Sequence, residues 1–159
     1  MTDATAAERG ANVHFPPPLV FVGFTLLGVM LRYTVGPIPF PATFRTRLLG
    51  VVVLLAGLTI IISARTLFTR TGQSPVPWKP TPELILRGPY RFTRNPMYVG
   101  VTCVQIGLGV AVSNPWIALL APLALLTVHF IAVLPEERYL AEKFGPSYNE
   151  YCASVRRYL

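Results

Sequence analysis

Apolar residues are gathered into four long blocks, separated by segments that hold most of the polar side chains. The blocks predict membrane-spanning helices at about residues 18–35, 48–68, 97–112 and 116–134. A helix needs about 20 residues to cross a hydrocarbon core of ~30 Å. The second and fourth blocks are long enough outright. The apolar parts of the first and third blocks hold only 16 residues each, so these helices would be tilted, extended or partly re-entrant.

The polar residues gather in two segments, 69–96 and 135–159, and most of the Lys and Arg residues lie there. The connection between the third and fourth blocks carries no charge. Because loops rich in Lys and Arg tend to stay in the cytoplasm, four spans predict cytoplasmic N- and C-termini and a cytoplasmic roof made by the two polar segments. Arg32, Arg45 and Arg47 would then lie on the outer side, against this tendency.

Composition narrows the class of protein further. The 159 residues suit one domain, 1–159, and are 52% apolar and only 13% charged, with a mean hydropathy of +0.50. These values exclude a disordered chain, and two cysteines exclude a disulfide scaffold. Basic loops beside anionic membrane lipid explain the net charge of +7, so no nucleic-acid partner is needed. No His or Cys spacing indicates a metal site. We therefore expect an all-α, polytopic membrane protein.

A first cluster of candidate functional residues lies at residues 87–100, RGPYRFTRNPMYVG. Its Gly-Pro pair indicates a turn, and Asn95-Pro96 indicates the start of the third helix, with Asn as the cap and Pro in the first turn. The N–H groups at a helix start favour an anionic group. Gly100, one turn further on, would let a ligand approach the backbone. The alternative is a basic turn that tyrosines anchor at the membrane surface.

A second cluster follows the fourth apolar block and begins with Glu136 and Glu137. Acidic residues at the end of a membrane helix are costly unless they have a partner. Neighbours on a helix point about 100° apart, so the two carboxylates cannot both face one ligand atom. We expect one of them to face a site and the other to pair with an Arg or cap the backbone. The alternative for this second residue is a solvated surface charge.

The motifs RGPYRFTRNPMYVG and PEERYLAEKFGPSYNEYCASVRR resemble, in order and spacing, the isoprenylcysteine carboxyl methyltransferase family of integral-membrane enzymes, to which phospholipid N-methyltransferases are related. The resemblance covers roughly residues 81–157. It implies S-adenosylmethionine bound beneath a cytoplasmic roof, with residues 82–85 as one lining stretch. The other residues that it implies for the cofactor are Tyr90, Asn95, Pro96, Met97, Tyr98, Gly100, Glu136 and Glu137.

Two positions depart from the pattern of this family. Asn95 stands where the prenylcysteine enzymes have a His, and it can form hydrogen bonds but cannot carry a charge. Ala132 stands where they have an Arg that helps to receive the substrate carboxylate. The candidates that remain for this charge are Arg91, Arg94 and Arg157.

The resemblance implies methyl transfer to a lipophilic acceptor in the membrane, most like carboxyl O-methylation of an isoprenylcysteine-type, prenylated substrate. A carboxylate needs neither metal nor base, so proximity and alignment would supply the catalysis. Phospholipid or amine N-methylation is an alternative that would need a base, with Glu137 or His129 as candidates. Two further alternatives are a related NADPH-dependent membrane reductase, which would want a longer chain, and a non-enzymatic membrane protein, which would leave both clusters unexplained.

Overall fold

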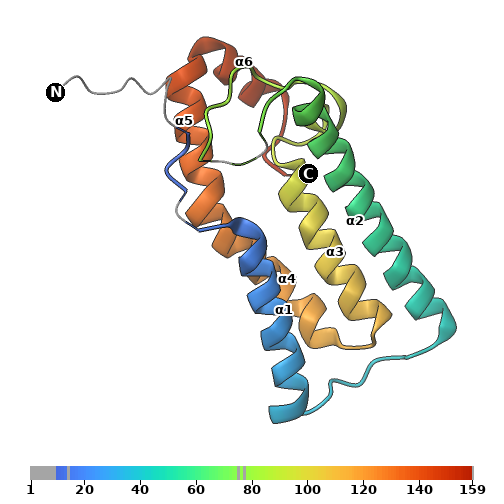
Figure 1. Cartoon of the computed structure of the whole chain (residues 1–159). Helices are drawn as coiled ribbons and strands as arrows, with labels where there is room; N and C mark the ends of the chain where they lie inside the picture. The colour runs from blue at the N-terminus through green and yellow to red at the C-terminus, as the bar shows by residue number, and fades with distance from the viewer. Residues whose placement is uncertain (1–9, 14, 75, 77, 159) are drawn as a thin grey trace.

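The computed structural model describes residues 10–13, 15–74, 76 and 78–158, which form helices and contain no strand (Figure 1). In chain order the elements are α1 (Pro17–Thr34), α2 (Phe44–Arg70), the 3₁₀ turn η1 (Gly88–Arg91), α3 (Pro96–Ala111), α4 (Pro115–Val128), the π-helical turn η2 (His129–Val133), α5 (Leu134–Phe144) and α6 (Pro146–Ser154). The elements α4, η2 and α5 run on as one helix, Pro115–Phe144.

Local sequence sets where most of these helices begin and end. Proline occupies the first turn of α1, α3 and α4, where its missing N–H leaves no intrahelical bond unmade. Thr43 caps α2 instead, because its hydroxyl accepts a hydrogen bond from the N–H of Thr46 at 3.3 Å. α5 ends at Gly145, whose φ of +50° turns the chain into α6. The break at Gly145 separates the short helix α6 from the long helix Pro115–Phe144.

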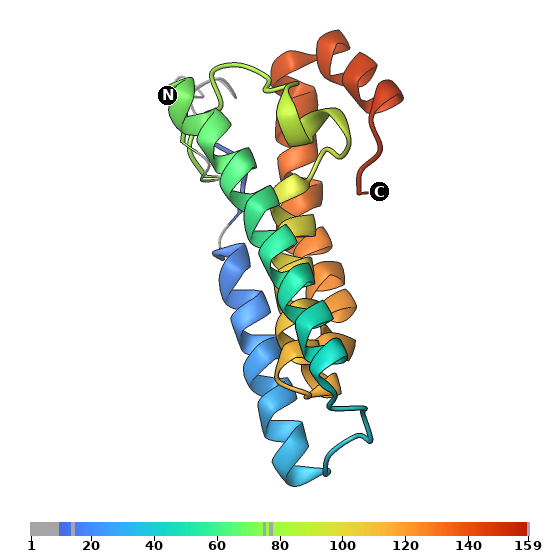
Figure 2. The ribbon, with the colours of Figure 1, turned by 90° about the vertical axis from the view of Figure 1, so that its right-hand side faces the viewer.

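The long helices form a bundle in which consecutive helices are not always the main neighbours. α2 packs mainly against α3, α1 packs mainly against α4, and α3 and α4 contact each other. The start of α1, the segment 71–95 and residues 134–158 lie at one end of the bundle, and residues 35–43 and 112–114 lie at the other (Figures 1 and 2). The two polar segments of the sequence therefore meet at one end, which we call the roof.

Glycine allows α2 and α3 to approach each other closely. A methyl group added at Gly57 of α2 would lie 2.5 Å from the carbonyl oxygen of Gly100 on α3. Two turns further along α3, a methyl group added at Gly107 would lie 2.6 Å from the carbonyl oxygen of Gly50 on α2. Side chains do not tolerate contacts this short, and membrane helices commonly use small residues where backbones meet. The two helices therefore pack closely against each other along most of the length of α3.

The helices confirm the expected all-α, polytopic membrane fold. α1, α2 and the helix Pro115–Phe144 are long and apolar enough to cross a membrane, and α3 is a shorter apolar helix of 16 residues. Many large apolar side chains on α1 and α2 are exposed, as expected of surfaces that face lipid. The predicted spans 18–35, 48–68 and 97–112 agree closely with α1, α2 and α3.

The helix that contains the fourth predicted span, 116–134, does not end with the apolar block but continues to Phe144. Pro135 has no N–H to donate to the carbonyl of Ile131, four residues earlier. The π turn η2 lies where this bond is missing, and it lets the helix continue instead of ending. The second acidic cluster is consequently built on the same helix as the fourth apolar block.

Candidate functional site

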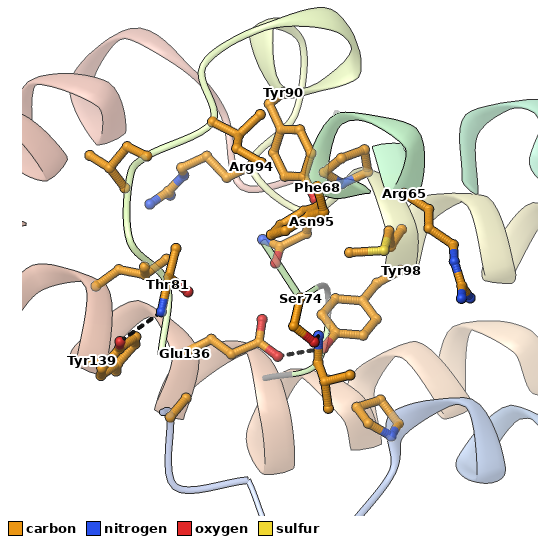
Figure 3. A pocket seen from close by; sticks show the side chains of 18 of the residues that line it. Arg65, Phe68, Ser74, Thr81, Tyr90, Arg94, Asn95, Tyr98, Glu136 and Tyr139 are labelled. Carbon is orange, nitrogen blue, oxygen red and sulfur yellow. Dashed lines mark hydrogen bonds between the residues drawn. The ribbon is translucent and has the colours of Figure 1, made fainter. Parts of the chain in front are cut away.

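A cavity of about 410 Å³ lies beneath the roof (Figure 3). Its wall comes from the start of α1, the last turns of α2, the segment before η1, the start of α3, and α5 and α6. Most of the wall is apolar. The charged and tyrosine side chains in it are Arg65, Glu83, Tyr90, Arg94, Tyr98, Glu136, Tyr139, Tyr148 and Tyr151. A largely apolar cavity with a few convergent polar groups is typical of a small-molecule site.

Tyr98 and Glu136 join two sides of this cavity. Tyr98 lies in the first turn of α3 and Glu136 in the first turn of α5. The phenol of Tyr98 donates a hydrogen bond of 2.6 Å to Oε1 of Glu136 (Figure 3). A hydrogen bond to a carboxylate is stronger than one between neutral groups, so it fixes both side chains. The cavity wall thereby presents a carboxylate that suits a cationic group of a ligand.

The π turn η2 determines which of the two neighbouring carboxylates lines the cavity. Each residue of a regular α-helix is rotated by about 100° from the one before. A π turn is wider than an α turn, so it rotates α5 relative to the direction that α4 would have given it. In the resulting orientation Glu136 lines the cavity and Glu137 does not. This is the division of roles expected for the pair.

Glu137 is held beside the cavity by two arginines. Nε and Nη2 of Arg157 donate hydrogen bonds to its two carboxylate oxygens at 2.9 and 2.8 Å, and Nη1 of Arg94 lies 3.3 Å from Oε1. The hydrogen bonding to Glu137 raises the pKa of Arg157. Nη1 of Arg94 also donates to Sγ of Cys152 at 2.7 Å, whereas its buried Nε has no hydrogen-bond partner. Arg94 is therefore a fixed cation in the cavity wall with one unused donor.

The C-terminal tail, residues 155–158, fastens the segment that leads into α3. The carbonyl oxygen of Arg157 accepts hydrogen bonds from Oγ1 of Thr93 and Nδ2 of Asn95, both at 3.0 Å. The main-chain N–H of Arg94 donates to the tail as well, at 2.9 Å. Asn95 holds the N-cap position of α3, but its side chain makes no cap hydrogen bond. The expectation that its side chain caps the helix is wrong, because the amide binds the tail.

Tyr90 is a buried aromatic residue of the cavity wall that η1 puts in place. Its carbonyl oxygen accepts a hydrogen bond of 2.7 Å from the phenol of Tyr151, and its ring packs edge-on against Phe68 with centroids 6.0 Å apart. Burial, and after it the charge of Glu136, raises the pKa of Tyr90, so the phenol stays neutral. The aromatic faces of Tyr90 and Tyr98 are suited to contact with a cation.

Comparison with protein families identifies the class of this protein. Residues 45–147 match the sequence model of the family described as phospholipid methyltransferase, and this match spans more than half of the chain. The chain belongs to the phospholipid methyltransferase family. Members of this family are integral-membrane methyltransferases and include the isoprenylcysteine carboxyl methyltransferases, so the resemblance carried by the two motifs is confirmed. A comparison with curated protein sequences gave no match.

The structure brings most of the sequence-predicted residues of this methyltransferase together at the cavity and leaves others outside it. Those in the wall are Tyr90, Arg94, Asn95, Pro96, Met97, Tyr98 and Glu136, with Glu83, Leu84 and Ile85 from the predicted stretch 82–85. Those outside the wall are Arg91, Gly100, Glu137 and Arg157. Arg91 is exposed, so Arg94 is the one of the three candidate arginines that lines the cavity.

Gly100 has a different role from the one that its position indicated. It was expected to let a ligand approach the backbone, but it faces α2. A methyl group there would lie 2.7 Å from Cγ1 of Ile61 and 2.8 Å from the carbonyl oxygen of Gly57. Helix packing therefore explains this glycine in the methyltransferase, and the expectation of a ligand contact at its backbone is not supported.

Two parts of the cavity wall come from the apolar blocks and not from the two polar segments that were expected to form the site. The first is the start of α1, with Pro17 and Phe21, and the second is the end of α2, with Ile61, Arg65 and Phe68. Arg65 carried a signal, because it is a charged residue inside a predicted membrane span. The apolar residues carried none, since they follow the same pattern as side chains that face lipid.

Proposed function

We propose that this protein transfers a methyl group from S-adenosylmethionine to the carboxylate of a lipophilic acceptor bound in the cavity. One observation carries the proposal. An acid, Glu136, two aromatic faces, Tyr90 and Tyr98, and a cation, Arg94, share the wall of one cavity within the residues that match the methyltransferase family.

The polar and aromatic side chains of the cavity suit the functional groups of this cofactor. Glu136 would hold the amino group, Arg94 with its unused Nε would hold the carboxylate, and the ring of Tyr98 would lie against the sulfonium. The cavity volume of about 410 Å³ is within the usual range of small-molecule sites, about 300–1,000 Å³. When bound, S-adenosylmethionine supplies a methyl group on a positively charged sulfur that becomes a neutral thioether after transfer.

The residues around the cavity favour a carboxylate acceptor over an amine. An amine must lose a proton. Of the two acids in the wall, Glu136 is assigned to the cofactor and Glu83 is exposed, and the two bases named from the sequence lie outside the wall. Glu137 is bound by two arginines, and Nδ1 of His129 lies 2.9 Å from the phenol oxygen of Tyr158. A carboxylate acceptor needs no base. The protein would then act by holding both reactants in line and by excluding water from an apolar cavity.

The roof would face the cytoplasm. It contains most of the basic residues, in agreement with the tendency of Lys and Arg to remain inside. Arg32, which lies at the opposite end and argued against this orientation, donates a hydrogen bond of 2.7 Å to the carbonyl oxygen of Ser113. It is partly buried in a contact between α1 and the connection that precedes α4. Packing therefore explains its position there.

Calorimetric titration of the detergent-purified protein tests this function. We expect saturable binding of S-adenosylhomocysteine and none of NADPH, followed by transfer of a labelled methyl group to a carboxylate amphiphile. Binding of NADPH alone would support the membrane reductase instead. Binding of neither ligand would contradict an enzyme that uses this cavity for a cofactor.

A further inference from the structure

We propose that Arg65 receives an anionic head group of the acceptor, so that the protein selects anionic amphiphiles. This inference rests on the proposed function, because it assigns the second part of the same cavity. It concerns a residue that is not among the arginines named from the sequence motifs.

Arg65 lies on α2, five residues before the helix ends at Arg70, and it lines the cavity as an exposed residue. The residues before it, from Ile60 to Ala64, are apolar apart from one serine. In Figure 3, Tyr98 lies between Glu136 on one side and Arg65 on the other. The proposed cofactor residues Glu136 and Arg94 therefore occupy one part of the cavity, and Arg65 occupies another.

The charge of Arg65 has no counter-charge in the described part of the chain. Both ion pairs found there are made by Glu137, one with Arg94 and one with Arg157. No hydrogen bond found among the described residues uses the Arg65 side chain either. A charged group within an apolar helix is costly unless it meets a partner or reaches the membrane surface. A bound anion is a partner that the cavity can supply.

Arg94 and Arg65 differ in the charge that they offer to a ligand. Arg94 is already paired with Glu137, which also binds Arg157, so its positive charge is largely balanced. Arg65 retains its full charge. Ala132 occupies the position where the prenylcysteine enzymes have their substrate-binding Arg. It is fully buried in the core and carries no charge. Arg65 is thus the cation that remains for the acceptor.

The surroundings of Arg65 supply the rest of an amphiphile site. Pro17 and Phe21 of α1 and Ile61 and Phe68 of α2 line the same cavity and offer apolar surface to a lipid tail. A guanidinium binds a carboxylate or a phosphate through two parallel hydrogen bonds. The head group is therefore either the carboxylate that accepts the methyl group or a phosphate next to the accepting atom, and an experiment can distinguish the two.

Tryptophan fluorescence offers a direct binding test, because Trp78 lines the cavity. The other tryptophan, Trp116, lies in the first turn of α4, at the end of the bundle opposite the roof. We would titrate the full chain, in a neutral detergent, with dodecanoate, dodecyl phosphate and uncharged dodecanol, which share one tail length. The variants are Arg65→Gln, Arg65→Lys and Arg70→Gln. Arg70 is the matched control, since it is an exposed arginine on the same helix, like Arg65, but does not line the cavity.

We expect Arg65→Gln to weaken binding of the preferred anion by about tenfold or more, Arg65→Lys to retain most of the affinity, and Arg70→Gln to bind like the wild type. The affinity for dodecanol should be the same in all three variants as in the wild type. The anion that binds more tightly identifies the head group as carboxylate or phosphate. Unchanged thermal unfolding of Arg65→Gln, together with rescue by Lys, would exclude misfolding as the cause.

Equal affinities of Arg65→Gln and the wild type for both anions would overturn the proposal and leave Arg65 as a lipid anchor at the membrane surface. Equal binding of the anions and dodecanol by the wild type would overturn it as well. Titration of the same samples with S-adenosylhomocysteine separates the two proposals. Cofactor binding that persists in Arg65→Gln would leave the proposed function intact whichever result the amphiphiles give.

Discussion

Tyr98 and Glu136 are 38 positions apart in the sequence, and one hydrogen bond of 2.6 Å joins them across the cavity. Each comes from one of the two motifs on which the family resemblance rests. The bond gives the spacing of these motifs a physical reason, since the hairpin of α3 and α4 must bring the first turn of α5 back to the first turn of α3. The two motifs therefore form one site.

The carboxylate of Glu136 should be needed for cofactor binding. Glu136→Gln keeps an oxygen that can accept the bond from Tyr98 but removes the negative charge. We expect the affinity for S-adenosylhomocysteine to fall by about tenfold or more, because a charge-assisted hydrogen bond to its amino group is lost. Calorimetric titration measures this change. Glu142→Gln is the matched control, since Glu142 is an exposed acid on the same helix. Similar affinities of the two variants would place the amino group of the cofactor elsewhere.

The contact between the C-terminal tail and Glu137 should stabilise the roof. Arg157→Gln removes the two hydrogen bonds to Glu137, whereas the side chain of the neighbouring Arg156 is exposed and serves as the control. The Arg157 side chain is 40% exposed, so solvent screens the pair and the expected loss is only about 1 kcal/mol. Thermal unfolding in detergent should show a lower midpoint for Arg157→Gln than for Arg156→Gln. A midpoint for Arg157→Gln equal to or above that of Arg156→Gln would mean that the bonds to Glu137 do not stabilise the roof.

The sequence predicted the helices well because long apolar blocks leave few other structures possible in a membrane. It also predicted that Glu136 and Glu137 would differ in role, because neighbours on a helix point in different directions. It did not indicate which of them would face the cavity. That depends on the π turn η2, which lies where Pro135 leaves one hydrogen bond unmade and which leaves the apolar pattern unchanged.

Contacts between distant segments account for the other differences between expectation and structure. Gly100 followed a ligand-binding motif in the sequence, yet it contacts α2, whose register against α3 no local pattern encodes. Asn95 was a good candidate for a helix cap until the tail supplied a carbonyl oxygen for its amide. Arg65 was visible as an unusual charge, but its place in the cavity wall depends on how α1 and α2 flank the start of α3.

The close approach of α2 and α3 should make Gly57 intolerant of any side chain. Gly57→Ala would bring a methyl group to 2.5 Å from the carbonyl oxygen of Gly100, and the backbones would have to move apart. We expect a loss of about 1–3 kcal/mol in the free energy of unfolding. Gly23→Ala is the control, since Gly23 lies in α1 with open space around it, and alanine should stabilise that helix by up to about 1 kcal/mol. Equal stabilities of the two variants would contradict the glycine contact.

Cysteine labelling in intact cells should show that the roof lies in the cytoplasm. Ala42 and Ser147 are exposed at opposite ends of the bundle, so Ala42→Cys and Ser147→Cys report on the two sides of the membrane. The background would carry Cys103→Ala and Cys152→Ser, because serine keeps an acceptor for the hydrogen bond from Arg94. An impermeant maleimide should label position 42 directly and position 147 only after permeabilisation. The reverse pattern would invert the orientation, and labelling of both positions in intact cells would contradict the arrangement of the helices itself.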